Sequence, residues 1–139
     1  MIPTEAVPSI AEAKPVSLGK YLLLEKIGEG IMAQLHRATT TDVHGAEKIL
    51  AIKRILPNLS GERDLAKAFL EEAKLTALLN HENIVRIYDS GQVKSSYFIA
   101  MEYLLAKDLK QIFDESRKKG LPLGFEHALF LSSQICSGL

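Results

Sequence analysis

The order of strand-like and helical segments is the feature that most constrains the fold of this chain. Three strand-like segments come first, followed by one helical segment, two more strand-like segments and two more helical ones, at residues 21–27, 33–40, 48–55, 62–80, 84–88, 97–103, 107–119 and 125–139. Short turns join the consecutive strands, which favours antiparallel pairing. The sequence therefore predicts an α+β fold in which helices pack on an antiparallel sheet.

Two local patterns refine this prediction. Four residues of the first helical segment are spaced four, four and three apart: Leu65, Phe69, Ala73 and Thr76. At this spacing they share one face of a helix, and that face is expected to pack on the sheet. The turn-forming segment 89–91, Asp-Ser-Gly, is expected to separate the last two strands.

Composition narrows the class of protein. The chain has 139 residues, of which 47% are hydrophobic and 24% charged, as in an ordinary soluble domain. Seventeen basic and 17 acidic residues give a formal net charge of zero, so no basic excess points to nucleic acid as a partner. The one cysteine, Cys136, is typical of a reducing compartment, and a cytoplasmic location is expected. We expect Cys136 to be a small core residue.

The first 17 residues have the composition of a flexible leader. Pro3, Pro8 and Pro15 are mixed with Ala, Glu and Ser, and no periodicity is visible. No run of about 18 apolar residues occurs anywhere in the sequence, so no membrane span is expected within it.

A pair of glycines interrupts the strand-like region. The segment Gly28-Glu29-Gly30 lies between two strands rather than between a strand and a helix. This context argues against a dinucleotide-binding fingerprint, which needs a helix N-terminus for the pyrophosphate. It suits a glycine-rich hairpin that covers phosphates with its backbone N–H groups. Two glycines alone are also compatible with a plain turn.

A lysine stands in an otherwise apolar strand. Lys53 follows Leu50-Ala51-Ile52, and a buried ammonium group needs an anionic partner because its desolvation is costly. Alternatively, Lys53 lies on the solvated face of the strand. Glu72 is a candidate partner because it neighbours the helix face predicted to pack on the sheet, and Glu71 competes with it for this role.

With the segments 81–85, His-Glu-Asn-Ile-Val, and 101–104, Met-Glu-Tyr-Leu, these motifs resemble the N-terminal lobe of a bacterial Ser/Thr protein kinase of the eukaryotic type. The resemblance rests on five motifs in the order of that family and covers residues 18–139. It implies a five-stranded antiparallel sheet with one packed helix, followed by two helices of an incomplete helical lobe. It divides the chain into a flexible leader, an ATP-binding lobe with its hinge, and the first helices of the second lobe, at residues 1–17, 18–104 and 105–139.

The resemblance also implies roles in ATP binding. Backbone N–H groups of the hairpin residues Gly28, Glu29, Gly30 and Ala33 would cover the triphosphate. Lys53 would hold the α- and β-phosphates, and Glu72 would fix Lys53. The remaining residues would surround the nucleoside: Ile27 as a lid, Leu35 and Ala51 on the two sides of adenine, Met101 as gatekeeper, Glu102 and Leu104 as hinge contacts, and Asp108 at the ribose.

The chain departs from the family pattern at several positions, and the milder changes are Glu82 in place of a proline and Leu35 in place of the common valine. Ala33 replaces the third glycine, and Ile31 stands where a small or polar residue is usual. Because a β-branched residue restricts the backbone, Ile31 is expected either to stiffen the loop tip or to exclude a glycine-like backbone conformation there. His36 stands where an aromatic residue is frequent, and we interpret it as a surface residue of its strand.

The motifs that complete phosphoryl transfer do not occur in these residues. The family uses one Asp to orient the substrate hydroxyl, and an Asn and a second Asp to hold Mg²⁺. We therefore expect Mg²⁺ only in a complete kinase, which would phosphorylate Ser or Thr of a protein substrate, and we expect these 139 residues alone to be inactive. The alternatives are a non-catalytic kinase-like binding or scaffold module and an unrelated α+β domain. The apolar stripe from Ala128 to Leu139 predicts self-association through an exposed last helix.

Overall fold

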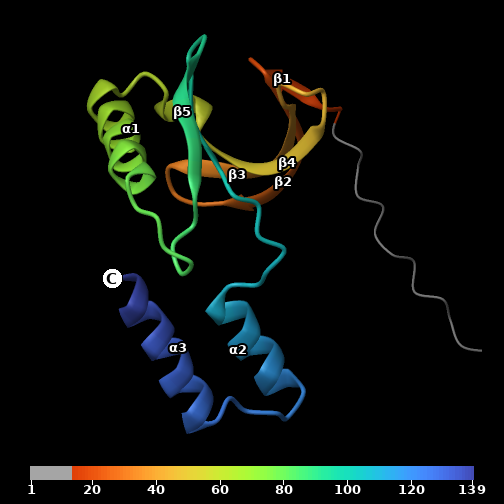
Figure 1. Ribbon diagram of the computed structural model, residues 1–139, viewed down its shortest axis with the longest axis vertical. Coiled ribbons are helices and arrows are strands. Elements are labelled where there is room, and N and C mark those ends of the chain that lie inside the picture. Colours follow the sequence, from red (N-terminus) through yellow and green to blue (C-terminus); the bar gives the residue numbers. More distant parts are fainter. Residues whose placement is uncertain (1–13) are drawn as a thin grey trace, which may run out of the picture.

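The structure, a computed structural model, describes residues 14–139, so most of the predicted leader lies outside the described residues. A strongly curled sheet and one helix form the upper part, and two further helices lie below them (Figure 1). The elements are β1 Val16–Leu18, β2 Tyr21–Glu29, β3 Ala33–Thr41, β4 Glu47–Ile55, the 3₁₀ helix η1 Pro57–Leu59, α1 Arg63–Ala77, β5 Ile87–Val93, β6 Ser96–Met101, α2 Leu109–Lys118 and α3 Phe125–Gly138.

The predicted antiparallel sheet is confirmed, but within residues 14–139 it has six strands instead of the predicted five. The strand order is β1-β2-β3-β4-β6-β5. The additional strand β1 begins at Val16, inside the segment predicted to be a leader, and it pairs with the start of β2. Gly19 adopts a φ of 59° in the turn between them. A three-residue strand is too short to show a period, so only its pairing reveals it.

The prediction of a turn at residues 89–91 is wrong, because this segment lies inside β5. Asp89 follows an irregularity in the β5–β6 register, and Gly91 pairs with Phe98. The carboxylate of Asp89 accepts a hydrogen bond from the Tyr21 hydroxyl at 2.6 Å and forms an ion pair with Lys20 at 2.9 Å. These tertiary contacts outweigh the local turn preference. The turn instead falls at Lys94, whose φ is 54°.

The two faces of the central strand β4 contribute to two different hydrophobic clusters. Leu50 and Ile52 point into the curl of the sheet, where they pack with Leu18, Tyr21, Leu23, Ala38, Phe98 and Ala100. Ile55 points to the opposite face and packs with Ala66, Phe69 and Ala73 of α1 and with Ile99 of β6. The predicted helix face is confirmed, since Phe69 and Ala73 are buried and Leu65 and Thr76 are half-buried.

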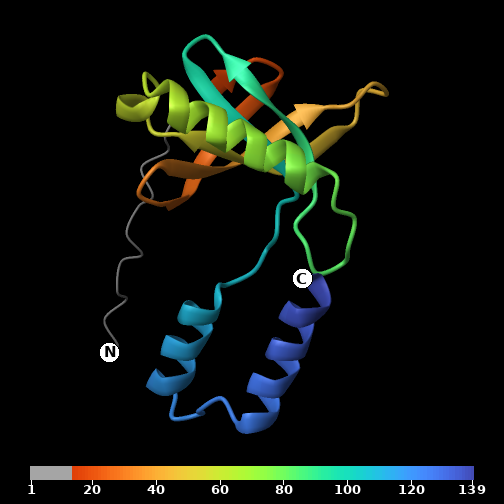
Figure 2. The same cartoon turned by 90° about the vertical axis from the view of Figure 1, so that its left-hand side faces the viewer.

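The helices α2 and α3 descend from the sheet and return toward it (Figure 2). Asp108 caps α2, and the end of α3 is held by Asn83, whose Nδ2 donates to the Gln134 carbonyl oxygen at 2.8 Å. Neither helix contains a buried residue. The expectation that Cys136 is a core residue is therefore wrong: it lies on α3 and is exposed. Self-association through α3 stays a prediction. The α3 residues Phe125, Phe130 and Ile135 are all more than half exposed.

None of the helices within residues 14–139 combines the length and the apolar character that crossing a lipid bilayer requires.

Candidate nucleotide-binding site

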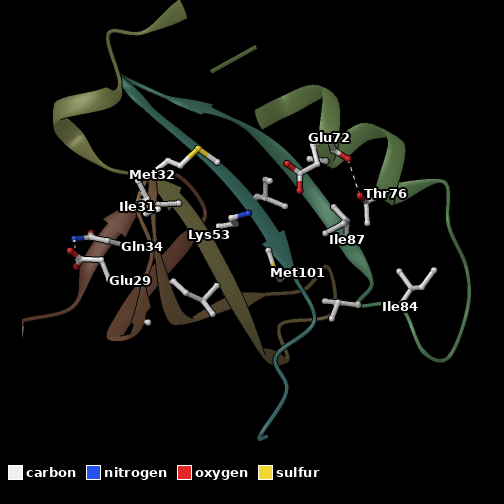
Figure 3. Close-up of a pocket in the computed structure, with 17 residues that line it drawn as sticks. Glu29, Ile31, Met32, Gln34, Lys53, Glu72, Thr76, Ile84, Ile87 and Met101 are labelled. Atoms are coloured by element: carbon white, nitrogen blue, oxygen red, sulfur yellow. Dashed lines mark hydrogen bonds between the residues drawn. The ribbon is translucent and has the colours of Figure 1, made fainter. Parts of the chain in front are cut away.

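A cavity of about 840 Å³ lies between the β2–β3 hairpin, the sheet and α1 (Figure 3). Its lining is mostly apolar, and Lys53 and Glu72 bring opposite charges to it. The full lining comprises the hairpin residues 28–35, then Lys53, Glu72, Ala73, Thr76, Ile84, Val85, Ile87, Ile99 and Met101. A cavity of this volume, apolar with a few charged groups, has the size and character of a small-molecule site.

The register of the sheet explains why Lys53 reaches this cavity. Gly28 of β2 pairs with Leu35 of β3, Leu35 pairs with Lys53 of β4, and Lys53 pairs with Ile99 of β6. Side chains of paired residues lie on the same face of a sheet. The register therefore aligns four residues in one row across four strands, on the face that α1 covers. The row runs from Gly28 of the hairpin through Leu35 and Lys53 to Ile99.

The hairpin is anchored at its base and open at its tip. The Gly30 N–H donates to the Ala33 carbonyl at 2.8 Å, and the Leu56 N–H after β4 donates to the Met32 carbonyl at 3.0 Å. Within residues 14–139, the N–H groups of Ile31 and Met32 donate to no other backbone group. They are thus available to an oxygen ligand. Ile31 is 95% exposed at the tip.

The Glu29 carboxylate forms its hydrogen bonds with other residues of the hairpin. This carboxylate accepts a hydrogen bond from Lys26 at 2.6 Å. It also accepts one from Gln34 at 3.1 Å (Figure 3). The hydrogen bond from Lys26, followed by the one from Gln34, lowers the pKa of Glu29. Its negative charge is therefore balanced locally, and an anionic ligand at the tip would meet less repulsion from it.

Lys53 and Glu72 point into the same cavity but are not in contact. No ion pair among residues 14–139 joins them within 4.0 Å. The Lys53 Nζ lies instead 5.6 Å from the centroid of the Phe69 ring. The competing Glu71 lies outside the cavity, 3.9 Å from Lys67. Of the two candidate carboxylates, Glu72 is the one that faces Lys53.

The remaining predicted residues fall into two groups. Gly28, Glu29, Gly30, Ala33, Leu35 and Met101 line the cavity with Lys53 and Glu72, whereas Ile27, Ala51, Glu102, Leu104 and Asp108 do not. Ala51 is a buried neighbour of the cavity, because it pairs with Met101. The Asp108 carboxylate is used in the helix cap, where it accepts the Gln111 N–H at 2.7 Å.

Glu102 ties two strand ends together at the hinge. Its N–H donates to the Arg86 carbonyl at 2.9 Å, and its carboxylate accepts the Arg86 N–H at 3.3 Å. The side chain of Glu102 consequently lines a second, more polar cavity behind the hinge. Only its backbone carbonyl is left for the predicted hinge contact.

Sequence reasoning missed the apolar back of the cavity. The side chains of Ala73, Thr76, Ile84, Val85, Ile87 and Ile99 line it. The Thr76 hydroxyl donates to the Glu72 carbonyl at 2.9 Å, so its hydrogen-bond acceptor lies within the helix. Alternation in β6 could have assigned Ile99 to the face of Met101. Nothing in the sequence brings the segment 84–87 opposite α1.

The interpretation of His36 as a surface residue is wrong. It is half-buried, and its Nε2 is buried without a hydrogen-bond partner among residues 14–139. It pairs with Ile52 and therefore faces away from Lys53. Burial, with smaller contributions from the charges of Arg54 and Lys26, lowers the pKa of His36.

The lowered pKa of His36 predicts a loss of stability in mild acid. Below the unfolded-state pKa of about 6.5, the unfolded chain binds a proton that the folded chain resists, so the free energy of unfolding falls as the pH falls. His36→Gln should reduce this dependence. Urea unfolding of the wild type and of the His36→Gln variant at pH 7.5 and pH 5.5 gives the change in the free energy of unfolding for each protein. Titration of the carboxylates, which both proteins share, cancels when the two changes are compared. Equal pH dependence in the two proteins would contradict the prediction.

Residues 14–139 contain no group of three or more His, Cys, Asp or Glu side chains arranged to hold a metal ion.

Comparisons with known proteins identify one family. The family model described as "Protein kinase domain" matches residues 21–139. A relative named tyrosine-protein kinase MasK, from Myxococcus xanthus, is 38% identical over 112 residues, which cover 78% of this chain and 17% of the relative. Serine/threonine-protein kinase pkn3 of Myxococcus xanthus is 35% identical over 122 residues, covering 86% of this chain and 21% of that protein.

Solved structures share the fold. The crystal structure of the Mycobacterium tuberculosis PknI kinase domain superposes with a TM-score of 0.71 at 20% identity, covering 93% of this chain and 51% of that chain. The present chain thus spans about half of the solved kinase domain and about a fifth of the two curated relatives named above.

Proposed function

This chain belongs to the protein kinase domain family, and from that premise we propose that its cavity binds ATP and that the complete protein transfers the γ-phosphoryl group to Ser or Thr of a protein substrate. The observation that carries the proposal is the position of Lys53. Its ammonium enters a cavity covered by a glycine hairpin, and a carboxylate stands on the facing helix (Figure 3).

The lining suits the parts of ATP. The apolar side chains of Leu35 and Met101 offer surfaces to a flat base at the hinge side of the cavity. The N–H groups of Ile31 and Met32 and the Lys53 ammonium offer donors to the phosphates. In protein kinases, the glycine-rich loop and this lysine have these roles. The cavity thus offers an apolar surface for the base, and it offers neutral N–H donors and one cation for the phosphates. These are the two kinds of contact that a nucleotide needs.

Glu72 orients Lys53 in the proposed reaction. The family needs the lysine–glutamate pair in place for transfer, and the distance between these side chains here requires α1 or the Lys53 side chain to shift first. The described residues offer no ligand set for Mg²⁺, so they do not fit the metal by themselves. Because the motifs that supply the catalytic Asp and the Mg²⁺ ligands do not occur in the sequence of residues 1–139, we propose that these residues alone do not transfer phosphate. The kinase domain is proposed to lie in the cytoplasm, where ATP is available.

The test is phosphoryl transfer by the full-length protein. Incubation with ATP labelled at the γ-phosphate, followed by phosphoamino-acid analysis, is expected to give phosphoserine and phosphothreonine. Phosphotyrosine alone would contradict the assignment of the acceptor, and one relative is named a tyrosine kinase. If the protein transfers no phosphate and ATP does not raise its Tm, the non-catalytic module is the better description.

The two glutamates of α1 provide a matched pair of variants. Glu72→Gln removes the carboxylate that faces Lys53 and should lower kcat by roughly 10- to 100-fold, as expected when a hydrogen bond between charged groups is lost. Glu71→Gln removes a charge on the neighbouring residue, whose exposed partner Lys67 lies outside the cavity, and should change kcat little. Steady-state kinetics measure both. A larger loss in the Glu71 variant would reverse the assignment.

A further inference from the structure

The environment of the Lys53 ammonium contains an aromatic ring that the proposed function does not use. The Nζ lies 5.6 Å from the centroid of the Phe69 ring, within the distance at which a cation is attracted by the face of an aromatic ring. No carboxylate among residues 14–139 lies within 4.0 Å of this ammonium. The ring is therefore the partner toward which Lys53 turns.

Phe69 is held in this place by packing on all sides. Its side chain is 4% exposed and packs with Ile55, Ala66, Ala73 and Ile99 between α1 and the sheet. It does not line the cavity itself, whereas Lys53 does. The ring thus lies behind the ammonium, on its α1 side, and a nucleotide in the cavity would leave it in place.

The helix connects Phe69 to Glu72. The two residues are three positions apart on α1, so their side chains are neighbours about one turn apart on the helix surface. An ammonium drawn toward the Phe69 ring is drawn toward the turn that also carries the Glu72 carboxylate. Without this attraction, a lysine side chain with four rotatable bonds would sample many other rotamers, and ordering it would cost entropy.

We propose that Phe69 is a positioning residue, which holds the Lys53 ammonium against α1 so that it is ready for the ATP phosphates and for Glu72. This inference rests on the proposed function. The ring acts through Lys53 and has no contact with the nucleotide. Its contribution should consequently appear in the binding of phosphates and not in the binding of the nucleoside.

The experiment compares ATP with adenosine in the full-length protein. Affinities are measured by calorimetry for the wild type, Phe69→Leu, Lys53→Met and Leu70→Ala. Leucine at position 69 keeps an apolar side chain but removes the ring. Leu70 is half-buried beside the same cluster and does not line the cavity, so Leu70→Ala controls for disturbance of the packing. In parallel, the Lys53 ε-methylene signal is observed by NMR without ligand, because a nearby aromatic ring shifts it.

The expected result is specific to the phosphates. Phe69→Leu should weaken ATP binding by about three- to tenfold and leave adenosine binding unchanged, and it should remove the ring-induced shift of the Lys53 signal. Leu70→Ala should leave the ratio of the two affinities unchanged. Lys53→Met should lower that ratio by about tenfold or more.

Four outcomes overturn the proposal. If Phe69→Leu weakens ATP and adenosine equally, Phe69 has only a structural role. If the Lys53 signal shows no ring-induced shift in the wild type, the contact does not exist in solution. If Lys53→Met leaves the ratio unchanged, the proposed ATP site fails and the role of Phe69 fails with it. A change of ratio in the Lys53 variant alone would overturn the role of Phe69 and leave the proposed function intact.

Discussion

Replacing Lys53 by methionine is expected to reduce phosphoryl transfer by the full-length protein on the order of 10²- to 10³-fold, the effect typical of removing one preorganised electrostatic group from an active site. Methionine keeps an unbranched apolar stem that is one atom shorter, and it removes the ammonium group. The stem lies between Leu35 and Ile99 in the sheet, and this packing should survive. The kinetic loss would therefore report the ammonium group.

Lys48 supplies the control for this variant. It lies on the same strand, and its ammonium is 3.5 Å from the centroid of the Tyr88 ring. It does not line the cavity. Lys48→Met removes the same charge from the same strand and should leave kcat within about twofold, because an exposed cation–π contact is worth little. Full activity in the Lys53 variant, or an equal loss in both variants, would contradict the assignment of Lys53.

Replacing Ile52 by alanine is expected to give the largest loss of stability among the substitutions considered. Ile52 is 0% exposed at the centre of β4, and it packs in the cluster inside the curl of the sheet. Removing a fully buried isoleucine side chain to alanine costs about 2–5 kcal/mol, since the cavity that is left collapses only partly. Domains are stable by only about 5–15 kcal/mol in total, so a large share of the stability would be lost.

The matched control for Ile52 is Ile49 on the same strand. Ile49 is 50% exposed, and Ile49→Ala removes the same atoms from a surface position. Thermal unfolding of the full-length protein, followed through the transition of this domain, should show a decrease in Tm on the order of 10 °C for Ile52→Ala and a much smaller one for Ile49→Ala. Similar decreases for the two variants would show that the cluster does not stabilise the domain as described.

The strands and helices with a clear period could be predicted from the sequence. The segments 33–40 and 48–55 correspond closely to β3 and β4, and the segment 62–80 contains α1. Phe69 and Ala73 were assigned correctly to the packed face of that helix because helical spacing depends only on local geometry. By contrast, β1 and the inclusion of residues 89–91 in β5 depend on pairing partners far away in the sequence, which no local period records.

The candidate site divides in the same way. The glycine pair, Lys53 and Glu72 were recognised as residue types in order, and the structure brings these residues to one cavity. The residues at its back were not recognised, because apolar side chains such as Ile84 and Ile87 look like any other core residues in a sequence. The assignment of Asp108 to the ribose stays a prediction, and the structure adds that its carboxylate caps α2.

By itself, the sequence determined the fold class and the family, and it singled out Lys53 and Glu72 as charged residues of one site, since these follow from periodicity and from motifs that are local in the chain. Only the tertiary structure decided which groups meet. The register across β2, β3, β4 and β6 positions Lys53 beside the hairpin, and the packing of α1 places the Phe69 ring, rather than the Glu72 carboxylate, next to the Lys53 ammonium. A distance between side chains on different elements depends on how those elements pack, and packing is a property of the whole fold.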